Sequence, residues 1–207
     1  YTGVFNAFHF KLFRYLVENL GFTAFAFETP FADAALAYRY VAGEDIPEDK
    51  VFCYGMSPMF GGWKETQDLL RWMREYNLSN KGEKPLHFYG VDIGSAAYGG
   101  NSAYPAVKAA LDYLAAVDPG YSHGFAWLLE TAETQDSFGF KALNPESQKR
   151  FLWEATRLYN RISYMGPHDA ALTSAEAYQW ALRSAYLAVF SARWFAGYAE
   201  AGCEDLS

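Results

Sequence analysis

Two short, largely apolar segments constrain the fold of this chain most. Residues 23–28 (TAFAFE) are closed by Thr29-Pro30, and residues 85–92 (PLHFYGVD) end in an acidic residue. Their length and bounding turn residues are typical of buried β-strands rather than of helices. Helical patterns fill the chain between them, so we predict a crossover unit in which the two strands are parallel.

Helices are predicted on both sides of the first strand. An apolar stripe at helical spacing opens the chain, formed by Phe5, Phe8, Leu12, Leu16 and Leu20. Gly21 follows as a residue that ends helices. Further helices are predicted over residues 31–42, which Pro30 is placed to start, and 63–76. The polar stretch 43–62 is predicted to be a loop with one short element.

The second half of the chain has a different character. Helices are predicted over residues 103–117, 121–132, 145–164 and 173–201, with breaks at Pro- and Gly-containing turns. We therefore predict an α/β fold with two parts. A partial parallel sheet with flanking helices occupies residues 1–100, and a helical, lid-like module covering the cleft occupies residues 101–207.

Composition and charge exclude several classes of protein. Hydrophobic residues make up 51% of the chain and charged residues 20%, which is a globular rather than a disordered composition. The net charge of −7 argues against a nucleic-acid partner, which requires a basic surface. No apolar run is long enough to cross a membrane, and no secretory signal is visible. With Cys53 and Cys203 as the only cysteines, a reducing, cytoplasmic location is the expectation.

Motifs for cofactors, metals and nucleophiles are missing. The sequence has neither a P-loop nor a dinucleotide-binding glycine pattern. Its histidines form no pair at metal-ligand spacing, so no metal or cofactor is predicted. Ser57 lies in Gly55-Met56-Ser57-Pro58-Met59, where a methionine replaces the second glycine of a nucleophile elbow, and an ordinary loop serine is the simpler interpretation.

Acidic residues close both predicted strands. Parallel strands end at one edge of a sheet, where ligands bind in such folds, so Glu28 and Asp92 are candidates for a site. Solvation of Glu28 by the loop, and a capping role for Asp92, remain open alternatives. His9 is either a helix-face histidine packed on the core or a site residue. The high aromatic content, 19%, fits a large core or an apolar cleft equally well.

Four blocks of sequence resemble the erythromycin esterase family. They are Phe10–Glu18 (FKLFRYLVE), residues 21–28 (GFTAFAFE), Arg71-Trp72-Met73-Arg74 with Tyr76-Asn77, and Phe88-Tyr89-Gly90-Val91-Asp92. Their order and spacing match that family over residues 1–92. The resemblance implies a metal-independent hydrolase that opens macrolide lactones. It also implies that the chain is the central piece of a longer protein, because the general-base histidine would precede Tyr1 and a second histidine-bearing strand would follow Ser207.

The resemblance assigns roles to particular residues. The family's strand-end glutamate falls on Glu28, and its basic residue on the first helix falls on His9, so both are predicted to be catalytic. Asp92, Trp63 and Arg74 are predicted to bind substrate. The expected function is hydrolysis of a bulky, macrolide-like lactone or ester by base-activated water, in antibiotic resistance or secondary metabolism. The alternative is a non-hydrolytic relative that binds or processes a polyketide-like small molecule.

Overall fold

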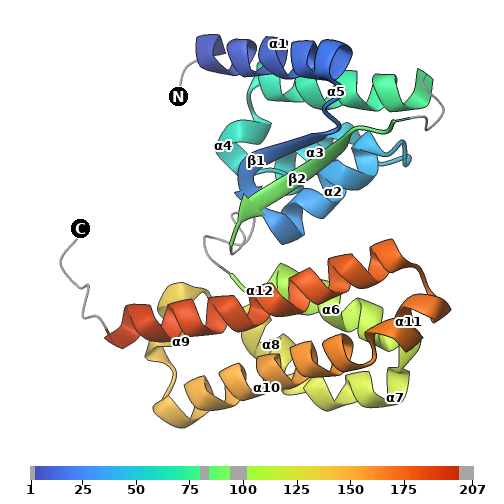
Figure 1. Cartoon of the computed structure of the whole chain (residues 1–207). Helices are drawn as coiled ribbons and strands as arrows, with labels where there is room; N and C mark the ends of the chain where they lie inside the picture. Colours follow the sequence, from blue (N-terminus) through green and yellow to red (C-terminus); the bar gives the residue numbers. More distant parts are fainter. Residues whose placement is uncertain (1–2, 80–83, 94–101, 201–207) are drawn as a thin grey trace. The chain divides into compact units, whose positions relative to one another are not determined.

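The computed structural model describes residues 3–79, 84–93 and 102–200 (Figure 1). The chain divides into two compact units, Tyr1–Asp92 and Ile93–Ser207, each with its own hydrophobic core. The predicted class is confirmed, since unit 1 holds a small parallel sheet among helices and unit 2 is helical. Within the described residues, no helix has the length and apolarity needed to cross a bilayer.

Unit 1 contains the two predicted strands. Its elements are α1 (Gly3–Leu20), β1 (Ala24–Pro30), α2 (Phe31–Val41), α3 (Glu48–Tyr54), α4 (Pro58–Gly61), α5 (Lys64–Ser79) and β2 (His87–Asp92). The strands pair in parallel, with Ala24 opposite His87 and Phe27 opposite Gly90. This register confirms the crossover unit expected from the sequence.

The stretch 43–62 differs from the prediction of a loop with one short element. It holds two helices, α3 and α4, which begin directly after Pro47 and at Pro58. Proline lacks an amide hydrogen, and the first turn of a helix needs none, so these prolines start helices instead of marking a loop. Val51 and Phe60 are buried and fix the two helices to the core.

Helix α1 has two apolar faces. It ends at Gly21, whose φ of 71° is left-handed and whose amide donates to the Val17 carbonyl, as a glycine cap does. Phe13 and Val17 are buried in the core of unit 1. Phe5 and Leu12, on the stripe recognised in the sequence, are exposed by 64% and 42%. The stripe therefore faces away from this core.

Aromatic rings on one face of the sheet build the core of unit 1. The ring centroids of Phe25 and Phe27 lie 6.2 and 6.1 Å from that of Phe88. Phe13 of α1 meets Phe25 edge-on at 4.8 Å, and Phe60 of α4 meets Phe27 at 5.1 Å. These contacts hold α1 and α4 against the strand that ends in Glu28.

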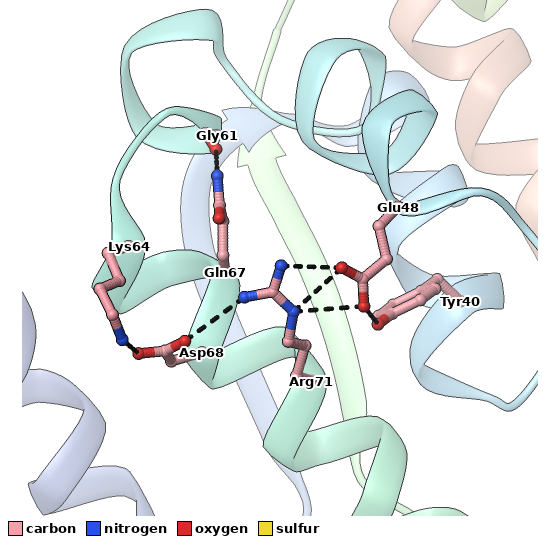
Figure 2. Close-up of polar contacts among 7 residues, drawn as sticks. All are labelled: Tyr40, Glu48, Gly61, Lys64, Gln67, Asp68 and Arg71. Carbon is pink, nitrogen blue, oxygen red and sulfur yellow. Dashed lines mark hydrogen bonds and ion pairs between the residues drawn. The ribbon is translucent and has the colours of Figure 1, made fainter.

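A polar cluster joins α5 to α2 and α3 (Figure 2). Arg71 Nη2 and Nε donate to Glu48 Oε2 at 2.7 and 3.0 Å, and the Tyr40 hydroxyl donates to Glu48 Oε1 at 2.6 Å. The bonds from Arg71, and then from Tyr40, lower the pKa of Glu48. Burial, followed by the bond to Glu48, raises the pKa of Tyr40 to about 12. Arg71 is thus a structural cation that ties α5 to α3.

Unit 2 is built around three long helices. Its elements are α6 (Tyr104–Val117), α7 (Pro119–Ser122), η1 (His123–Phe125), α8 (Ala126–Thr134), α9 (Ser137–Ala142), α10 (Pro145–Tyr164), α11 (Gly166–Leu172) and α12 (Ala175–Glu200). Helix α12 packs on α6 and α10. Phe140 closes the core, with its ring centroid 5.4 Å from that of Phe151 and 5.5 Å from that of Phe195.

The helices of unit 2 depart from the sequence prediction in three places. The single helix expected over 121–132 is three pieces, α7, η1 and α8, and α9 and α11 were not expected. Acidic caps explain part of this, because Asp118 and Asp136 accept hydrogen bonds from the first-turn amides of α7 and α9. That this helical module covers the cleft stays a prediction.

Cys53 is exposed, and Cys203 lies outside the described residues.

Candidate functional site

A cavity of about 670 Å³ lies between α1 and β1. Its volume is in the range of small-molecule sites in proteins. The lining is mostly apolar and comes from both elements, with one residue from α4. The lining residues are Phe5, Asn6, His9, Leu12, Phe13, Leu16, Phe22, residues 24–28 and Phe60. Both residues predicted to be catalytic, His9 and Glu28, are among them.

The cavity has a polar end and an apolar end. A short turn joins α1 to β1, so the two elements run in opposite directions, as Figure 1 shows. The start of α1, with Asn6 and His9, therefore lies toward the carboxyl end of β1, where Glu28 stands. Leu16 and Phe22 lie toward the other end. Glu28 and His9 are both exposed side chains, which is what a residue facing substrate needs.

Asn6 is a site residue that the sequence analysis missed. Its side chain lines the polar end, and its Nδ2 atom is buried with no hydrogen-bond partner among the described residues. A buried amide donor without a partner costs about 1–3 kcal/mol, so it favours an acceptor brought by another molecule or segment. The one signal in the sequence is its position, three residues before His9 on the same helical face.

The residues predicted to bind substrate lie elsewhere. Asp92 is exposed at the end of β2, where it pairs in register with Pro30, and it does not line the cavity. Trp63 packs behind the lining, with its ring 4.9 Å from that of Phe60. Arg74 Nη1 donates to the carbonyls of Tyr40 and Glu44 at 2.5 and 2.6 Å, at the end of α2. The structure thus gathers His9 and Glu28 but neither Asp92 nor Arg74.

The described part of the chain shows neither a metal site nor an activated serine nucleophile. No group of three or more His, Cys, Asp and Glu residues there is arranged to hold a metal ion. Ser57 has its backbone amide bonded to Thr29 Oγ1 at 2.8 Å, and its hydroxyl lies 3.5 Å from the same atom. These contacts join Ser57 to another hydroxyl and not to a base of the kind that activates a nucleophile.

Sequence comparison links the chain to one family. The family model described as erythromycin esterase matches residues 17–204. The chain is 28% identical over 168 residues to erythromycin esterase type II of Escherichia coli, an alignment covering 75% of the chain and 37% of that protein. The chain thus spans well under half the length of this curated relative.

Solved structures share the fold. A protein of Bacillus cereus matches with a TM-score of 0.69 and 21% identity, over 90% of this chain and 43% of that one. A succinoglycan biosynthesis protein matches with a TM-score of 0.69 and 19% identity, over 90% and 43%. A mutant of the erythromycin esterase EreC in its open conformation matches with a TM-score of 0.63 and 16% identity, over 89% and 45%.

Proposed function

Because the chain belongs to the erythromycin esterase family, we propose that it serves the hydrolysis of a lactone or ester carried by a bulky, largely apolar small molecule. One observation supports this most directly: His9 and Glu28 line the same cavity, at its polar end. The macrolide-like substrate and a place in antibiotic resistance or secondary metabolism are part of the proposal.

The reaction needs two kinds of group. A base removes a proton from water as the water oxygen attacks the ester carbonyl carbon, and a donor stabilises the resulting oxyanion. The intermediate then collapses, the acyl–oxygen bond breaks, and the alcohol leaves with a proton. A lactone so opened gains one water, about 18 daltons in mass.

In the proposed reaction, Glu28 and His9 act beside the ester carbonyl carbon that the water attacks. In the proposed arrangement, the Glu28 carboxylate fixes the attacking water or orients the base, and a protonated His9 binds that carboxylate or the oxyanion. The exposed rings and leucines of α1 contact the apolar body of the substrate. The predicted substrate contacts of Asp92, Trp63 and Arg74 stay predictions. Substitutions at these positions can be tested in the turnover assay described next.

The test is turnover by the full-length protein, measured by mass spectrometry on a panel of macrolides and simple esters. We expect ring-opened products in the wild-type reaction. Glu28→Gln and His9→Phe are expected to lower kcat/KM by at least about 100-fold, in line with the loss of an acid–base or oxyanion group. Both positions are exposed, so the melting temperature should hardly change.

Matched controls remove the same residue types at positions outside the cavity lining. Glu18→Gln removes an exposed carboxylate of α1 that pairs with Arg14 outside the cavity, and His123→Gln removes a histidine of unit 2. Both should retain wild-type turnover. Full activity of Glu28→Gln and His9→Phe, alongside active controls, would overturn the assignment of the site. The 207 residues alone are expected to lack full turnover.

A second function is favoured by the lining itself. The cavity is mostly apolar, and such a lining suits the apolar body of a bound compound whether or not a reaction follows. A non-hydrolytic protein that binds a polyketide-like compound fits these facts. Saturable binding of a macrolide without any gain of 18 daltons would select this function over the first.

A further inference from the structure

Asn6 carries an amide donor without a partner among the described residues. The residue lies on α1, and its side chain lines the cavity at the end that also holds His9 and Glu28. Its Nδ2 atom is buried and makes no hydrogen bond there. Buried polar groups are nearly always paired in folded proteins, so an exception calls for an explanation. A few polar groups in an otherwise apolar cavity are what orients a bound ligand, and a ligand can supply the missing acceptor.

Two nitrogen-bearing side chains of α1 can reach one oxygen atom. Asn6 and His9 are three residues apart on the helix, so their Cβ atoms lie about 5–6 Å from each other on one face. Side chains at that spacing can each bring an N–H group to about 3 Å from the same acceptor. The carboxylate of Glu28 comes from β1, which forms the other wall of the cavity. The donors and the carboxylate thus belong to different walls.

The Asn6 amide can turn toward the cavity without losing a hydrogen bond. The last torsion of an asparagine side chain is broad and soft, so the amide reorients with little strain. Its Nδ2 has no partner to give up among the described residues. Asn77 shows the contrast, because its amide is fixed by bonds to the backbone of Val41 and Leu86. An acceptor that enters the cavity therefore gains the whole of a new hydrogen bond at Asn6.

We propose that Asn6 binds the oxyanion of the proposed reaction, with its Nδ2 donating to the carbonyl oxygen of the ester that is cleaved. As the water oxygen bonds to the carbonyl carbon, the π electrons of the C=O bond move onto that oxygen and the water proton passes to the base. The amide keeps its protons, and its bond strengthens because the acceptor becomes anionic. When the intermediate collapses, the C=O bond re-forms, the bond to the alcohol oxygen breaks, and the alcohol takes up a proton.

This role fixes which wall of the cavity holds the carbonyl oxygen. An amide N–H donates at any ordinary pH, whereas an ionised carboxylate only accepts hydrogen bonds. The oxyanion therefore belongs beside Asn6 on α1, and Glu28 is left to position water on the β1 side. The role of Asn6 rests on the proposed hydrolysis and adds to it a residue outside the sequence-based predictions.

The first measurement is kcat and KM of the full-length protein on an ester that the wild type hydrolyses. Asn6→Leu keeps the number of side-chain heavy atoms and removes the amide. We expect kcat to fall at least about 100-fold while KM changes less than about threefold, because the donor acts mainly on the developing charge. Asn6→Asp keeps the shape but has no N–H group, and should lose at least as much. Asn19→Leu, at an exposed position of α1 outside the cavity lining, should retain wild-type turnover.

A phosphonate analogue of the same ester separates this role from a structural one. Its anionic oxygens imitate the tetrahedral intermediate, so its Kd in Asn6→Leu should rise by the factor by which kcat/KM falls. Isothermal titration calorimetry measures this Kd. Asn19→Leu should bind the phosphonate as the wild type does. A merely structural role for Asn6 would weaken the binding of ester and phosphonate alike.

The melting temperature of the ligand-free protein gives a readout that needs no turnover. Leucine in place of an unpaired buried amide removes a desolvation cost, so Asn6→Leu should melt about 2 °C or more above Asn19→Leu. Both variants carry the same gain in helix propensity, which cancels in the comparison. An equal or lower melting temperature would show that the full-length chain already satisfies the amide, and would overturn the proposal.

Turnover by the wild type distinguishes failure of this role from failure of the proposed function. If the wild type hydrolyses no ester in the panel, the hydrolysis and the role of Asn6 are both refuted. If the wild type is active and Asn6→Leu keeps its kcat or its affinity for the phosphonate, the role of Asn6 alone is refuted and the hydrolysis stands.

Discussion

The carboxylate of Asp169 is fully buried in unit 2 and accepts a hydrogen bond of 2.7 Å from Arg161 Nη1. Arg161 Nη2 also reaches Asp118 Oδ2 at 3.0 Å, and His168 Nδ1 lies 3.0 Å from the other oxygen of Asp169. One guanidinium on α10 thus holds the first turn of α11 and the start of α7. The geometry makes Asp169 a structural anion rather than a catalytic one.

Removal of this anion should destabilise unit 2. Asp169→Ala leaves the half of the Arg161 guanidinium that faces Asp169 buried without its partner, and the expected loss of unfolding free energy is about 3 kcal/mol. Urea denaturation followed by circular dichroism measures it. Asp112→Ala, which breaks an exposed pair with Lys108, should cost under about 1 kcal/mol. Equal losses in the two variants would contradict the structural role.

The Glu48 carboxylate predicts a pH dependence for unit 1. Its pKa is lowered in the folded state, first by the bond from Arg71, so its stabilising effect is present above the ordinary pKa of 4.5 and is lost as the pH falls through the folded value. Glu48→Gln should lower the melting temperature at pH 7, and its difference from the wild type should shrink as the pH falls below 4.5. Because this side chain is partly exposed, the effect should stay under about 1 kcal/mol.

Thermal melts between pH 3 and pH 7 compare the two proteins. Asp49→Asn, an exposed neighbour on α3, is the matched control and should follow the wild-type curve. A constant offset between Glu48→Gln and wild type across this range would show that the carboxylate acts by packing and not by charge.

Asn77 should be a strong determinant of stability in unit 1. Its Nδ2 donates to the carbonyls of Val41 and Leu86 at 2.8 and 2.9 Å, and its Oδ1 accepts from the Leu86 amide at 2.7 Å. Asn77→Ala leaves these backbone groups without partners, so we expect a loss of about 3 kcal/mol in urea denaturation. Asn19→Ala, which removes one exposed bond on α1, should cost far less. Similar costs for both would refute this account.

Gly90 is required by the close approach of the two strands. A Cβ there would lie 2.5 Å from the Thr29 carbonyl oxygen and 2.7 Å from that of Pro30, both of them backbone atoms. Gly90→Ala should therefore lower the unfolding free energy by about 2 kcal/mol or more. Gly120→Ala meets its nearest atom at 4.0 Å and should be nearly neutral. Differential scanning fluorimetry of both variants distinguishes the two cases.

The strands could be predicted from sequence because apolar runs bounded by turn residues are short-range signals. Glu28 was found in the same way, as the residue that ends such a run. Asp92 fulfilled the same criterion, yet it lies outside the cavity because the cavity borders the edge of β1 remote from β2. Which edge of a strand is open depends on its neighbours, and that information is not local.

Other features depended on tertiary contacts. Nothing in the sequence of α5 indicates that carbonyl groups at the end of α2 lie beside Arg74. Asn6 is an ordinary polar residue in sequence, and its significance comes from a burial that leaves its amide unpaired. Only one short element was predicted where the structure has α3 and α4, because Pro47 and Pro58 serve equally well in loops and at helix starts.

The parallel pairing of β1 with β2 also has a kinetic consequence. Ala24 and His87 are neighbours in the sheet but are separated by about 60 residues of chain. Closing a loop of that length carries an entropic penalty of roughly 4 kcal/mol before any ladder bond forms. We therefore expect the sheet to form late in the folding of unit 1, after the helices between the strands have docked. Folding of this unit should accordingly be slow, with a rate limited by long-range contact formation.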